Sequence, residues 1–278
     1  MAGQEVRGRE GFEEQGAAFL RANLEPSQWD YGAHRPPLSH ALAGRVLTVA
    51  LQDDQGESAR LRLVFHEAEL EWEAAGASTA GEAARVPYEA FAPAPDLYFI
   101  SFLADQKISW ALVVDSRSGA VTAIRGTVVD ADIVTTVLAG LVEEIASGEG
   151  RRGHPAFSLA GTRLLNEYAD NVAYEHIYLN DTYVTWVGVR GPEAGQADTE
   201  EYRAFKIRDG LYLVCWNEKV LTVQMTFLFD LYHGLCVGQV FGLVDGQLVH
   251  NTIGARTSLV HSALAELPDV PRLSSALR

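Results

Sequence analysis

Cysteine is scarce in this chain, which has only Cys215 and Cys236 among 278 residues. Their spacing forms no CxxC motif, so we expect neither a disulfide framework nor a zinc site, and both should be small buried side chains. Other potential metal ligands are scattered without HxH or HExxH spacing: His154, His233, His250 and His261. The sequence therefore predicts no metal site.

Positive charge is also scarce. The chain has 22 Lys and Arg against 37 Asp and Glu, which gives a formal net charge of -15. Binding to nucleic acid needs clustered Lys and Arg, and the arginines here are spread along the chain. Nucleic acids and anionic membrane surfaces are therefore not expected as partners.

Long apolar runs and cofactor motifs are missing as well. The first residues, MAGQEVRGREGFEEQG, lack the apolar core of a secretory signal, and residues 220–229 are too few and too polar to span a bilayer. No GxGxxG follows a predicted strand, and neither GxxxxGK(S/T) nor Gly-x-Ser-x-Gly occurs. We expect a soluble, cytoplasmic protein that uses no cofactor.

What the sequence does contain is an internal repeat. LAGRVLTVAL, which begins at Leu42, is echoed by LAGTRLLNEY at Leu159, and Trp72 lies 114 residues before Trp186. Three further pairs keep nearly the same separation: Tyr98 with Tyr212, Asp115 with Asp230, and Gly119 with Gly234. Several anchors in one order at a nearly constant separation indicate two copies of one fold.

Each copy consists of short runs of alternating polarity separated by turn residues, a pattern typical of strands. In the second copy, strands are predicted at residues 173–179, 183–189, 202–207, 211–217, 221–229 and 236–242, with hairpin turns at 179–181 and 229–234. Evenly spaced strands without helices between them favour an antiparallel meander that closes into a barrel. We predict a mainly β protein with two tandem antiparallel calycin-like (lipocalin-like) barrels and a few short helices.

Two segments carry a helical periodicity: EGFEEQGAAFLRANL near the N-terminus and DADIVTTVLAGLVEEIASG, which begins at Asp130. SGEGRRGHP, at 147–155, is interpreted as a linker, and residues 73–87 as a Gly/Ala/Ser loop. The predicted organisation is a helical extension at 1–37, a first barrel with its connecting helix at 38–146, the linker, and a second barrel at 156–278.

Three segments, YADNVAYEHIYLNDTYVTW, GQADTEEYRAFKI and LYLVCWNEK, resemble the MoaF family, named for molybdenum-cofactor biosynthesis protein F. The resemblance covers most of the chain and is sharpest from residue 171 to residue 242. It implies two related calycin-like barrels, in agreement with the repeat. A shared fold does not by itself fix a chemistry.

The second copy is similar, more distantly, to the cofactor-free phenolic acid decarboxylases, which hold an aromatic acid inside a barrel. In that family two tyrosines and an arginine bind the carboxylate, and a glutamate two residues after a tryptophan transfers the proton. Glu218 follows Trp216 by two residues, and Tyr168 matches one tyrosine. Asn166 stands at the other tyrosine position and Gln196 near the arginine position, so the resemblance implies an incomplete carboxylate clamp.

Glu218 is the central candidate from the residues themselves. Strand alternation puts it in phase with Tyr212 and Trp216 on an aromatic face, where burial would raise its pKa and suit it for acid/base work. The alternative is that NEK forms a hairpin tip with Glu218 in water. The corresponding position of the first copy is Ala104 or Asp105.

Three residues, Tyr174, His176 and Tyr178, alternate along one strand. His176, with a pKa near neutrality, is a candidate acid/base partner of Glu218, or a structural strand histidine. Arg190 could hold a substrate carboxylate at the barrel mouth, or end its strand in solvent. The other candidate substrate contacts, each with an alternative role in the core or in strand pairing, are Trp186, Tyr202, Trp216, Gln224 and Thr226.

The sequence thus predicts a cofactor-independent enzyme that binds a small aromatic or conjugated organic acid or carbonyl in its second barrel. A lyase step such as decarboxylation, or an isomerisation or cyclisation, would use Glu218, His176 and Tyr168 as catalytic residues. One alternative is a carrier for a pterin-like or other metabolite linked to molybdenum-cofactor metabolism. A further alternative is that one barrel is purely structural or provides the contact of a homodimer, which would suit the first barrel.

Overall fold

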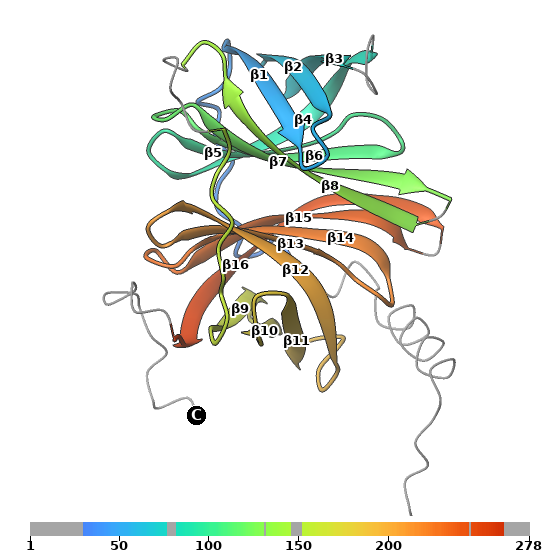
Figure 1. The fold of residues 1–278 in the computed structure, drawn as a ribbon. Coiled ribbons are helices and arrows are strands. Elements are labelled where there is room, and N and C mark those ends of the chain that lie inside the picture. The colour runs from blue at the N-terminus through green and yellow to red at the C-terminus, as the bar shows by residue number, and fades with distance from the viewer. Residues whose placement is uncertain (1–29, 77–81, 131, 146–151, 245, 264–278) are drawn as a thin grey trace, which may run out of the picture.

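Two closed β-barrels form the part of the chain that the computed structural model describes, residues 30–76, 82–130, 132–145, 152–244 and 246–263. Each barrel has eight strands, neighbouring strands are antiparallel, and the first strand pairs with the last. Figure 1 shows the barrels stacked one above the other. The predicted architecture of tandem antiparallel barrels is confirmed.

The strands follow one another around each barrel in chain order. The first barrel consists of β1 (Val46–Asp53), β2 (Ser58–Phe65), β3 (Glu69–Gly76), β4 (Glu82–Ala94), β5 (Leu97–Leu103), β6 (Ile108–Asp115), β7 (Ala120–Val129) and β8 (Asp132–Val142). The second consists of β9 (Arg163–Ala169), β10 (Val172–Tyr178), β11 (Tyr183–Arg190), β12 (Ala197–Arg208), β13 (Leu211–Asn217), β14 (Thr222–Asp230), β15 (Leu235–Val244) and β16 (Gln247–His261).

The helix predicted from Asp130 is wrong, because this segment forms β8. It pairs with β1 on one side and β7 on the other. Ile, Val and Thr fill the segment, and their branched side chains favour a strand, while a short apolar run fits either periodicity. The described residues contain no helix. The helix predicted near the N-terminus lies outside them.

The predicted loop is shorter than expected. β3 continues to Gly76 and β4 begins at Glu82, so most of residues 73–87 is strand. The end of the linker lies against the first barrel, where the Gly153 N–H donates to Gly140 O (2.9 Å) and the His154 N–H to Thr122 Oγ1 (3.0 Å).

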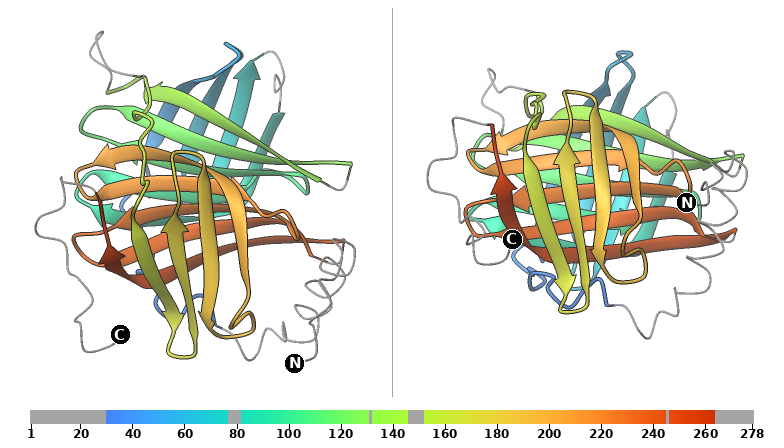
Figure 2. Two further views of the ribbon diagram at one scale, coloured as in Figure 1. Left: turned by 60° about the horizontal axis from the view of Figure 1, so that its bottom comes forward. Right: turned by 90° about the horizontal axis from the view of Figure 1, so that it is seen from below.

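The two barrels contact each other through the outer faces of their central strands. The shared core contains, among others, Phe91, Phe99, Val113 and Ile124 from the first barrel and Leu211, Leu213, Cys215 and Leu228 from the second. Figures 1 and 2 show β12–β15 facing the first barrel and β9–β11 turned away from it. Strands in the contact are therefore buried on both faces, one toward the barrel interior and one toward the other barrel.

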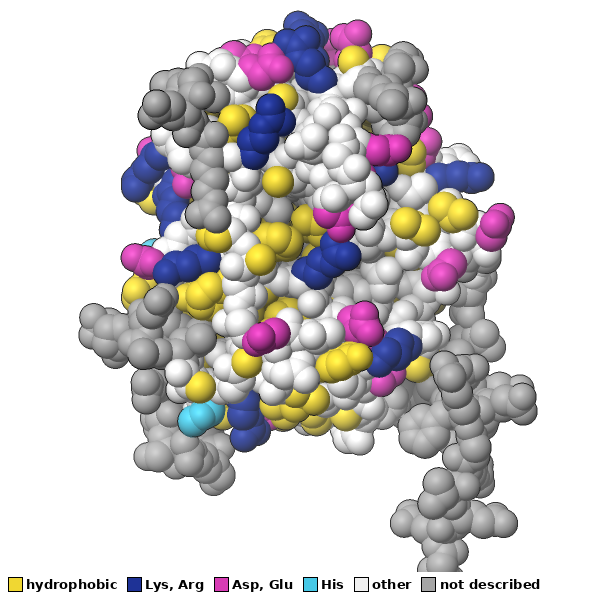
Figure 3. Space-filling view, viewed as in Figure 1, with side chains coloured by type: hydrophobic (Ala, Val, Ile, Leu, Met, Phe, Trp, Pro, Cys, Tyr) yellow, Lys and Arg dark blue, Asp and Glu magenta, His cyan; other side chains and the backbone are white. Residues whose placement is uncertain are grey.

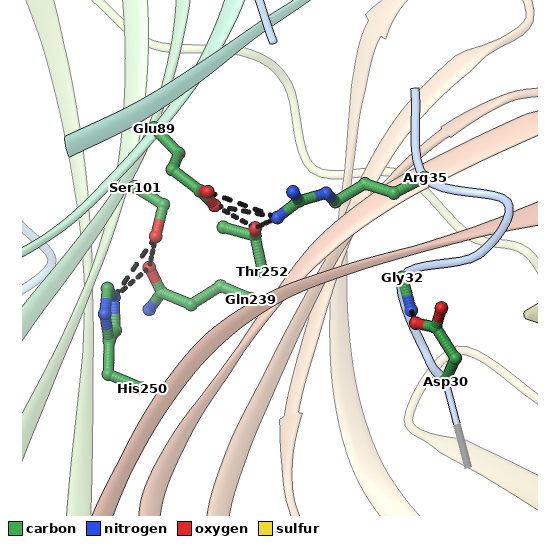
Figure 4. Close-up of polar contacts among 8 residues, drawn as sticks. All are labelled: Asp30, Gly32, Arg35, Glu89, Ser101, Gln239, His250 and Thr252. Carbon is green, nitrogen blue, oxygen red and sulfur yellow. Dashed lines mark hydrogen bonds and ion pairs between the residues drawn. The ribbon is translucent and has the colours of Figure 1, made fainter. Parts of the chain in front are cut away.

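Polar groups also join the barrels. Arg35, which precedes β1, donates to Glu89 on β4 (3.0 Å) and to Thr252 on β16 (Figure 4). Beside it, Ser101 Oγ donates to Gln239 Oε1 (2.6 Å), and His250 lies next to both. On the outer face drawn in Figure 3, basic side chains are interspersed with acidic and apolar ones.

Candidate functional site in the second barrel

Glu218 points into the second barrel although it stands at a hairpin. It follows the last residue of β13, and its N–H donates to Val223 O (2.9 Å), so the alternation of the strand extends to it. Tyr212 and Trp216 belong to the interior core on the same face. Glu218 Oε2 accepts a hydrogen bond from Trp186 Nε1 (2.9 Å) and Oε1 accepts one from Trp216 Nε1 (2.7 Å).

The environment of this carboxyl group strongly favours its protonated form. Burial raises the pKa of Glu218 from 4.5 to about 8, against the effect of the two indole N–H bonds. Negative charge on Glu200 and Glu193 raises the pKa further. The residue as a whole is partly exposed, while both of its carboxyl oxygens are held by indole N–H groups. With a pKa near neutrality, such a group can both donate and accept a proton at physiological pH.

His176, on β10, is enclosed by aromatic rings. Its imidazole lies 5.3 Å from the ring of Trp216, 5.6 Å from Phe227 and 6.0 Å from Phe229, measured between centroids. Burial lowers the pKa of His176 to about 3, so the expected near-neutral pKa is wrong and the imidazole is uncharged at pH 7. His176 can form hydrogen bonds in the interior but does not carry a proton there as a cation.

Several buried polar atoms of the second barrel have no hydrogen-bond partner in the protein. They include His176 Nδ1, Asn166 Nδ2 and the Tyr178 hydroxyl. The carbonyl oxygen of Asn166 accepts from Thr257 Oγ1 (2.8 Å), so only its amide nitrogen is unused. Buried polar groups are normally hydrogen-bonded, so each of these atoms is a place where a bound molecule would gain a hydrogen bond.

Tyr174 connects the interior to two groups that the sequence did not reveal. Its hydroxyl donates to Glu193 Oε2 (2.6 Å) and lies 3.0 Å from the hydroxyl of Tyr31, in the segment before β1. The Tyr31 ring packs edge-on against Tyr168 (5.7 Å), and its carbonyl accepts from the Gly254 N–H (3.0 Å). Residues ahead of the first barrel thus complete the wall of the second.

Burial also sets the protonation of this group. Burial is the main cause of the raised pKa of Tyr31, which is about 12. It is also the main cause of the pKa values above the usual range at Tyr168, Tyr174 and Glu193. For Tyr168, nearby charge on Glu218 is a further, smaller cause. The tyrosines are therefore hydroxyl donors and not phenolates at neutral pH.

Glu200, on β12, is a third carboxyl group near Glu218. Its side chain is fully buried, and Oε1 accepts the Lys219 N–H (3.2 Å). Its Oε2 is 3.7 Å from Lys219 Nζ, which also donates to Thr199 O. Burial raises the pKa of Glu200 above the usual range.

Arg190 does not reach the interior. A β-bulge shifts the pairing of β11, so that Ala173 faces Arg190 while Tyr174 faces Gly188. The extra residue turns the Arg190 side chain to the outer surface, where it forms an ion pair with Glu167. Of the two placements considered for Arg190, the structure shows the one at the surface near the end of its strand.

Of three other candidate contacts, two face the first barrel and the third uses its hydroxyl within the barrel wall; the Thr226 hydroxyl has no hydrogen-bond partner. Gln224 faces the first barrel, where its Nε2 donates to Thr135 Oγ1 (2.5 Å), and Thr226 lies on the same side of β14. Tyr202 faces the interior, but its hydroxyl donates to Asn180 O (2.9 Å) and accepts from the Leu159 N–H (3.3 Å). These residues belong to the framework of the protein.

The first barrel has an apolar side chain at each corresponding interior position. In the first barrel Leu63 pairs with Trp72 across two neighbouring strands, and in the second barrel His176 pairs with Trp186 in the same way. Because Trp72 is the counterpart of Trp186, Leu63 is the counterpart of His176. By the same register, Val49 of the first barrel corresponds to Asn166 of the second. Likewise, Leu61 corresponds to Tyr174 and Phe65 to Tyr178. All of the first-barrel residues belong to one hydrophobic core.

Ala104 is the counterpart of Glu218. The Ala104 N–H donates across its hairpin to Ile108 O (2.8 Å), as the Glu218 N–H does to Val223 O, and Ala104 lies in the first-barrel core. Trp72, the counterpart of Trp186, has a buried Nε1 without a partner. The first barrel thus keeps the indole donor but lacks the carboxyl group that would accept from it.

Comparison with known proteins agrees with the division into two barrels. The model of the MoaF N-terminal domain matches residues 29–130, and the model of the MoaF C-terminal domain matches residues 154–263. The chain belongs to the MoaF family. Protein MoaF of Klebsiella aerogenes is 28% identical to it over 198 residues, which are 64% of this chain and 75% of that protein.

A solved structure of a proposed beta-lactamase from Burkholderia vietnamiensis also matches part of the chain. The match covers 37% of this chain and 95% of that one, with 16% sequence identity and a TM-score of 0.33. A likeness at this level carries no argument about the MoaF-family barrels described above.

The described residues contain no group of three or more His, Cys, Asp or Glu placed to hold a metal ion, and no helix that is long and apolar enough to cross a membrane. Cys215 and Cys236 are both free and buried, as predicted, and burial raises the pKa of each thiol.

Proposed function

We propose that the second barrel binds a small aromatic or conjugated organic compound and that Glu218 transfers a proton to or from it. The observation that carries the proposal is a carboxyl group with a pKa near 8, enclosed by aromatic side chains and held at both oxygens by indole N–H groups. Perturbed acids of this kind are typical of sites that perform acid/base chemistry.

Each carboxyl oxygen of Glu218 uses one lone pair for an indole, so the acidic proton occupies one of the remaining positions. The protonated form can donate to a carbon or oxygen of the substrate. The resulting carboxylate is stabilised by the same two N–H groups, which become charge-assisted donors, and can then remove a proton elsewhere on the molecule. Donation followed by removal gives an isomerisation or cyclisation, and donation to carbon as another group departs gives a lyase step.

The other interior residues orient the compound in this proposal. Tyr168 lies close enough to Glu218 for negative charge on Glu218 to raise the pKa of Tyr168. Tyr174 and Tyr178 share the inward face of β10 with His176. The role of His176 is that of an uncharged hydrogen-bonding group. The aromatic rings of Trp186, Trp216 and Phe227 provide flat surfaces for a conjugated ligand.

Native mass spectrometry of freshly purified protein, with mass analysis of the released small molecule, tests the proposal. The wild-type protein should convert the bound compound on incubation, whereas Glu218→Gln should retain it unchanged. Glu201→Gln, on the exposed face of β12, is the matched control and should behave as wild type. Equal conversion by Glu218→Gln would remove the proposed mechanism.

Binding without chemistry is the second candidate, and the unpartnered polar atoms of the interior favour binding whether or not a reaction follows. In that case the protein is a carrier of a small metabolite. A ligand that is retained stoichiometrically and never converted by the wild type would support the carrier over the enzyme.

A further inference from the structure

The basic side chains of the second barrel bear on the charge of its ligand. A buried carboxylate needs a cation or several hydrogen-bond donors to offset its lost hydration. Two basic side chains of the second barrel form ion pairs with outward-facing carboxylates: Arg163 with Glu175 and Arg190 with Glu167. Neither is turned toward Glu218.

The remaining basic groups are placed in the same way. Lys219 is half-exposed and is engaged by Glu200 and Thr199. Arg208 pairs with Asp115 of the first barrel, and Lys206 pairs with the exposed side chain of Asp209. Arg203 and Arg256 are exposed. Among the described residues of this barrel, no basic side chain is turned to the interior.

The carboxyl groups of three glutamates do lie near the interior. Glu218, Glu200 and Glu193 are close enough that the latter two raise the pKa of the first. Glu218 is mostly protonated at pH 7, but a carboxylate ligand would still bury its own charge near Glu200 and Glu193, with no basic side chain turned toward it. Desolvation of that unpaired charge acts against an anionic ligand, and negative charge on Glu200 and Glu193 adds electrostatic repulsion.

Glu200 Oε2, which is 3.7 Å from Lys219 Nζ, also lacks a hydrogen-bond partner, but three other unused interior atoms are uncharged. Asn166 Nδ2 and the Tyr178 hydroxyl are donors without partners on side chains that are almost fully buried, and His176 Nδ1 is unused as well. An amide nitrogen and a hydroxyl can donate to a carbonyl oxygen without carrying charge. Aromatic rings next to His176 supply the apolar surface.

We propose that the interior of the second barrel binds uncharged aromatic or conjugated carbonyl compounds and rejects the corresponding carboxylates. This inference rests on the proposed function and narrows its substrate class. It separates the protein from decarboxylases of aromatic acids, whose substrates enter as anions, and it favours proton transfer on a neutral carbonyl compound.

Isothermal titration calorimetry at pH 7 with two pairs of equal shape tests the inference: cinnamamide with cinnamate, and benzamide with benzoate. Within a pair that binds, the amide should bind at least about tenfold more tightly than the carboxylate, as expected when one buried charge is left unpaired. Carboxylate affinity equal to or greater than amide affinity would overturn the inference while leaving a ligand site in place. Binding of no compound from either pair would contradict the proposed function and the inference with it.

Two variants show whether the interior charges cause the discrimination. Glu200→Gln removes one negative charge without a change of shape, and should narrow the ratio of amide to carboxylate affinity by strengthening carboxylate binding. The control Glu201→Gln changes the same charge on the outer face of the same strand and should leave both affinities unchanged. An equal effect of the two variants would show that only the net charge of the protein matters.

Discussion

Substitution of Glu218 by Gln should change how the stability of the second barrel depends on pH. The folded protein holds the Glu218 proton with a pKa of about 8, whereas an exposed glutamate has a pKa of 4.5. The folded state therefore binds this proton more tightly than the unfolded state does. The stabilisation from Glu218 is complete below pH 4.5 and is lost as the pH rises to about 8.

The magnitude follows from the two pKa values. At about 1.36 kcal/mol per pKa unit, the difference corresponds to roughly 5 kcal/mol of unfolding free energy between pH 4.5 and pH 8. Gln keeps one oxygen for Trp186 or Trp216, but its NH₂ group cannot accept from the other indole. This leaves a buried donor unpaired, at a pH-independent cost of about 1–3 kcal/mol.

The two stability curves should therefore cross. The wild type should be more stable near pH 5, and Glu218→Gln should be more stable near pH 9, by roughly 2–4 kcal/mol. Urea unfolding at pH 5, 7 and 9, followed by tryptophan fluorescence, measures both curves, with Glu201→Gln as the control. Parallel curves for wild type and Glu218→Gln across this range would refute the argument that Glu218 is protonated by its surroundings.

Three further predictions concern residues around Glu218. Trp186→Phe removes one indole donor that lowers the pKa of Glu218, so the midpoint of the Glu218 titration by carboxyl ¹³C NMR should move above 8; an unchanged or lower midpoint would contradict the hydrogen bond. Trp72→Phe deletes an indole whose N–H has no partner, so in urea unfolding at pH 9 it should cost less stability than Trp186→Phe does. The expected difference is about 1.5–3 kcal/mol, the contribution of a hydrogen bond to a charged group. Equal costs would count against the assigned difference between the barrels. Arg190→Ala removes a surface ion pair with Glu167, so calorimetry should show unchanged ligand affinity and a stability loss of no more than about 1 kcal/mol, whereas a large loss of affinity would place Arg190 in the site after all.

Much of the fold follows from the sequence because the alternation of side chains is local. β13 begins and ends at the predicted residues, since LYLVCWN is bounded by turn residues and has a side-chain period of two. The same alternation correctly turns Glu218 inward. β8 was predicted wrongly as a helix because a short run of Val, Ile, Leu and Ala satisfies both periods, and only its pairing with β1 and β7 decides between them.

The choice between the alternatives at the site depends on long-range contacts. Gln224 is a candidate substrate contact with a structural role as the alternative, and the structure shows the structural role, because the outer face of β14 is buried against the first barrel. Regular alternation would put Arg190 on the same face as Trp186, but one extra residue in the strand turns the Arg190 side chain to the other face. No local pattern indicates such a bulge in TWVGVR.

Tyr31 and Glu193 could not be found by spacing in the sequence. Tyr31 reaches Tyr174 across 143 positions of the chain, and Glu193 lies in a turn whose residues are otherwise typical of solvent-exposed loops. The internal repeat is one sequence signal for a difference between the barrels. It aligns Trp72 with Trp186, and it aligns Glu218 with either Ala104 or Asp105. The structure shows that the counterpart is Ala104.

Glu218 is a carboxyl group inside the second barrel, hydrogen-bonded to two indoles and half-protonated near pH 8. The chain has five tryptophans, so a ¹⁵N–¹H spectrum contains five indole signals. The signals of Trp186 and Trp216, assigned by single Trp→Phe substitutions, should shift together with a midpoint of about 8 and stop shifting in Glu218→Gln. A common midpoint near 4.5, or no shift of either signal between pH 5 and pH 9, would contradict the claim.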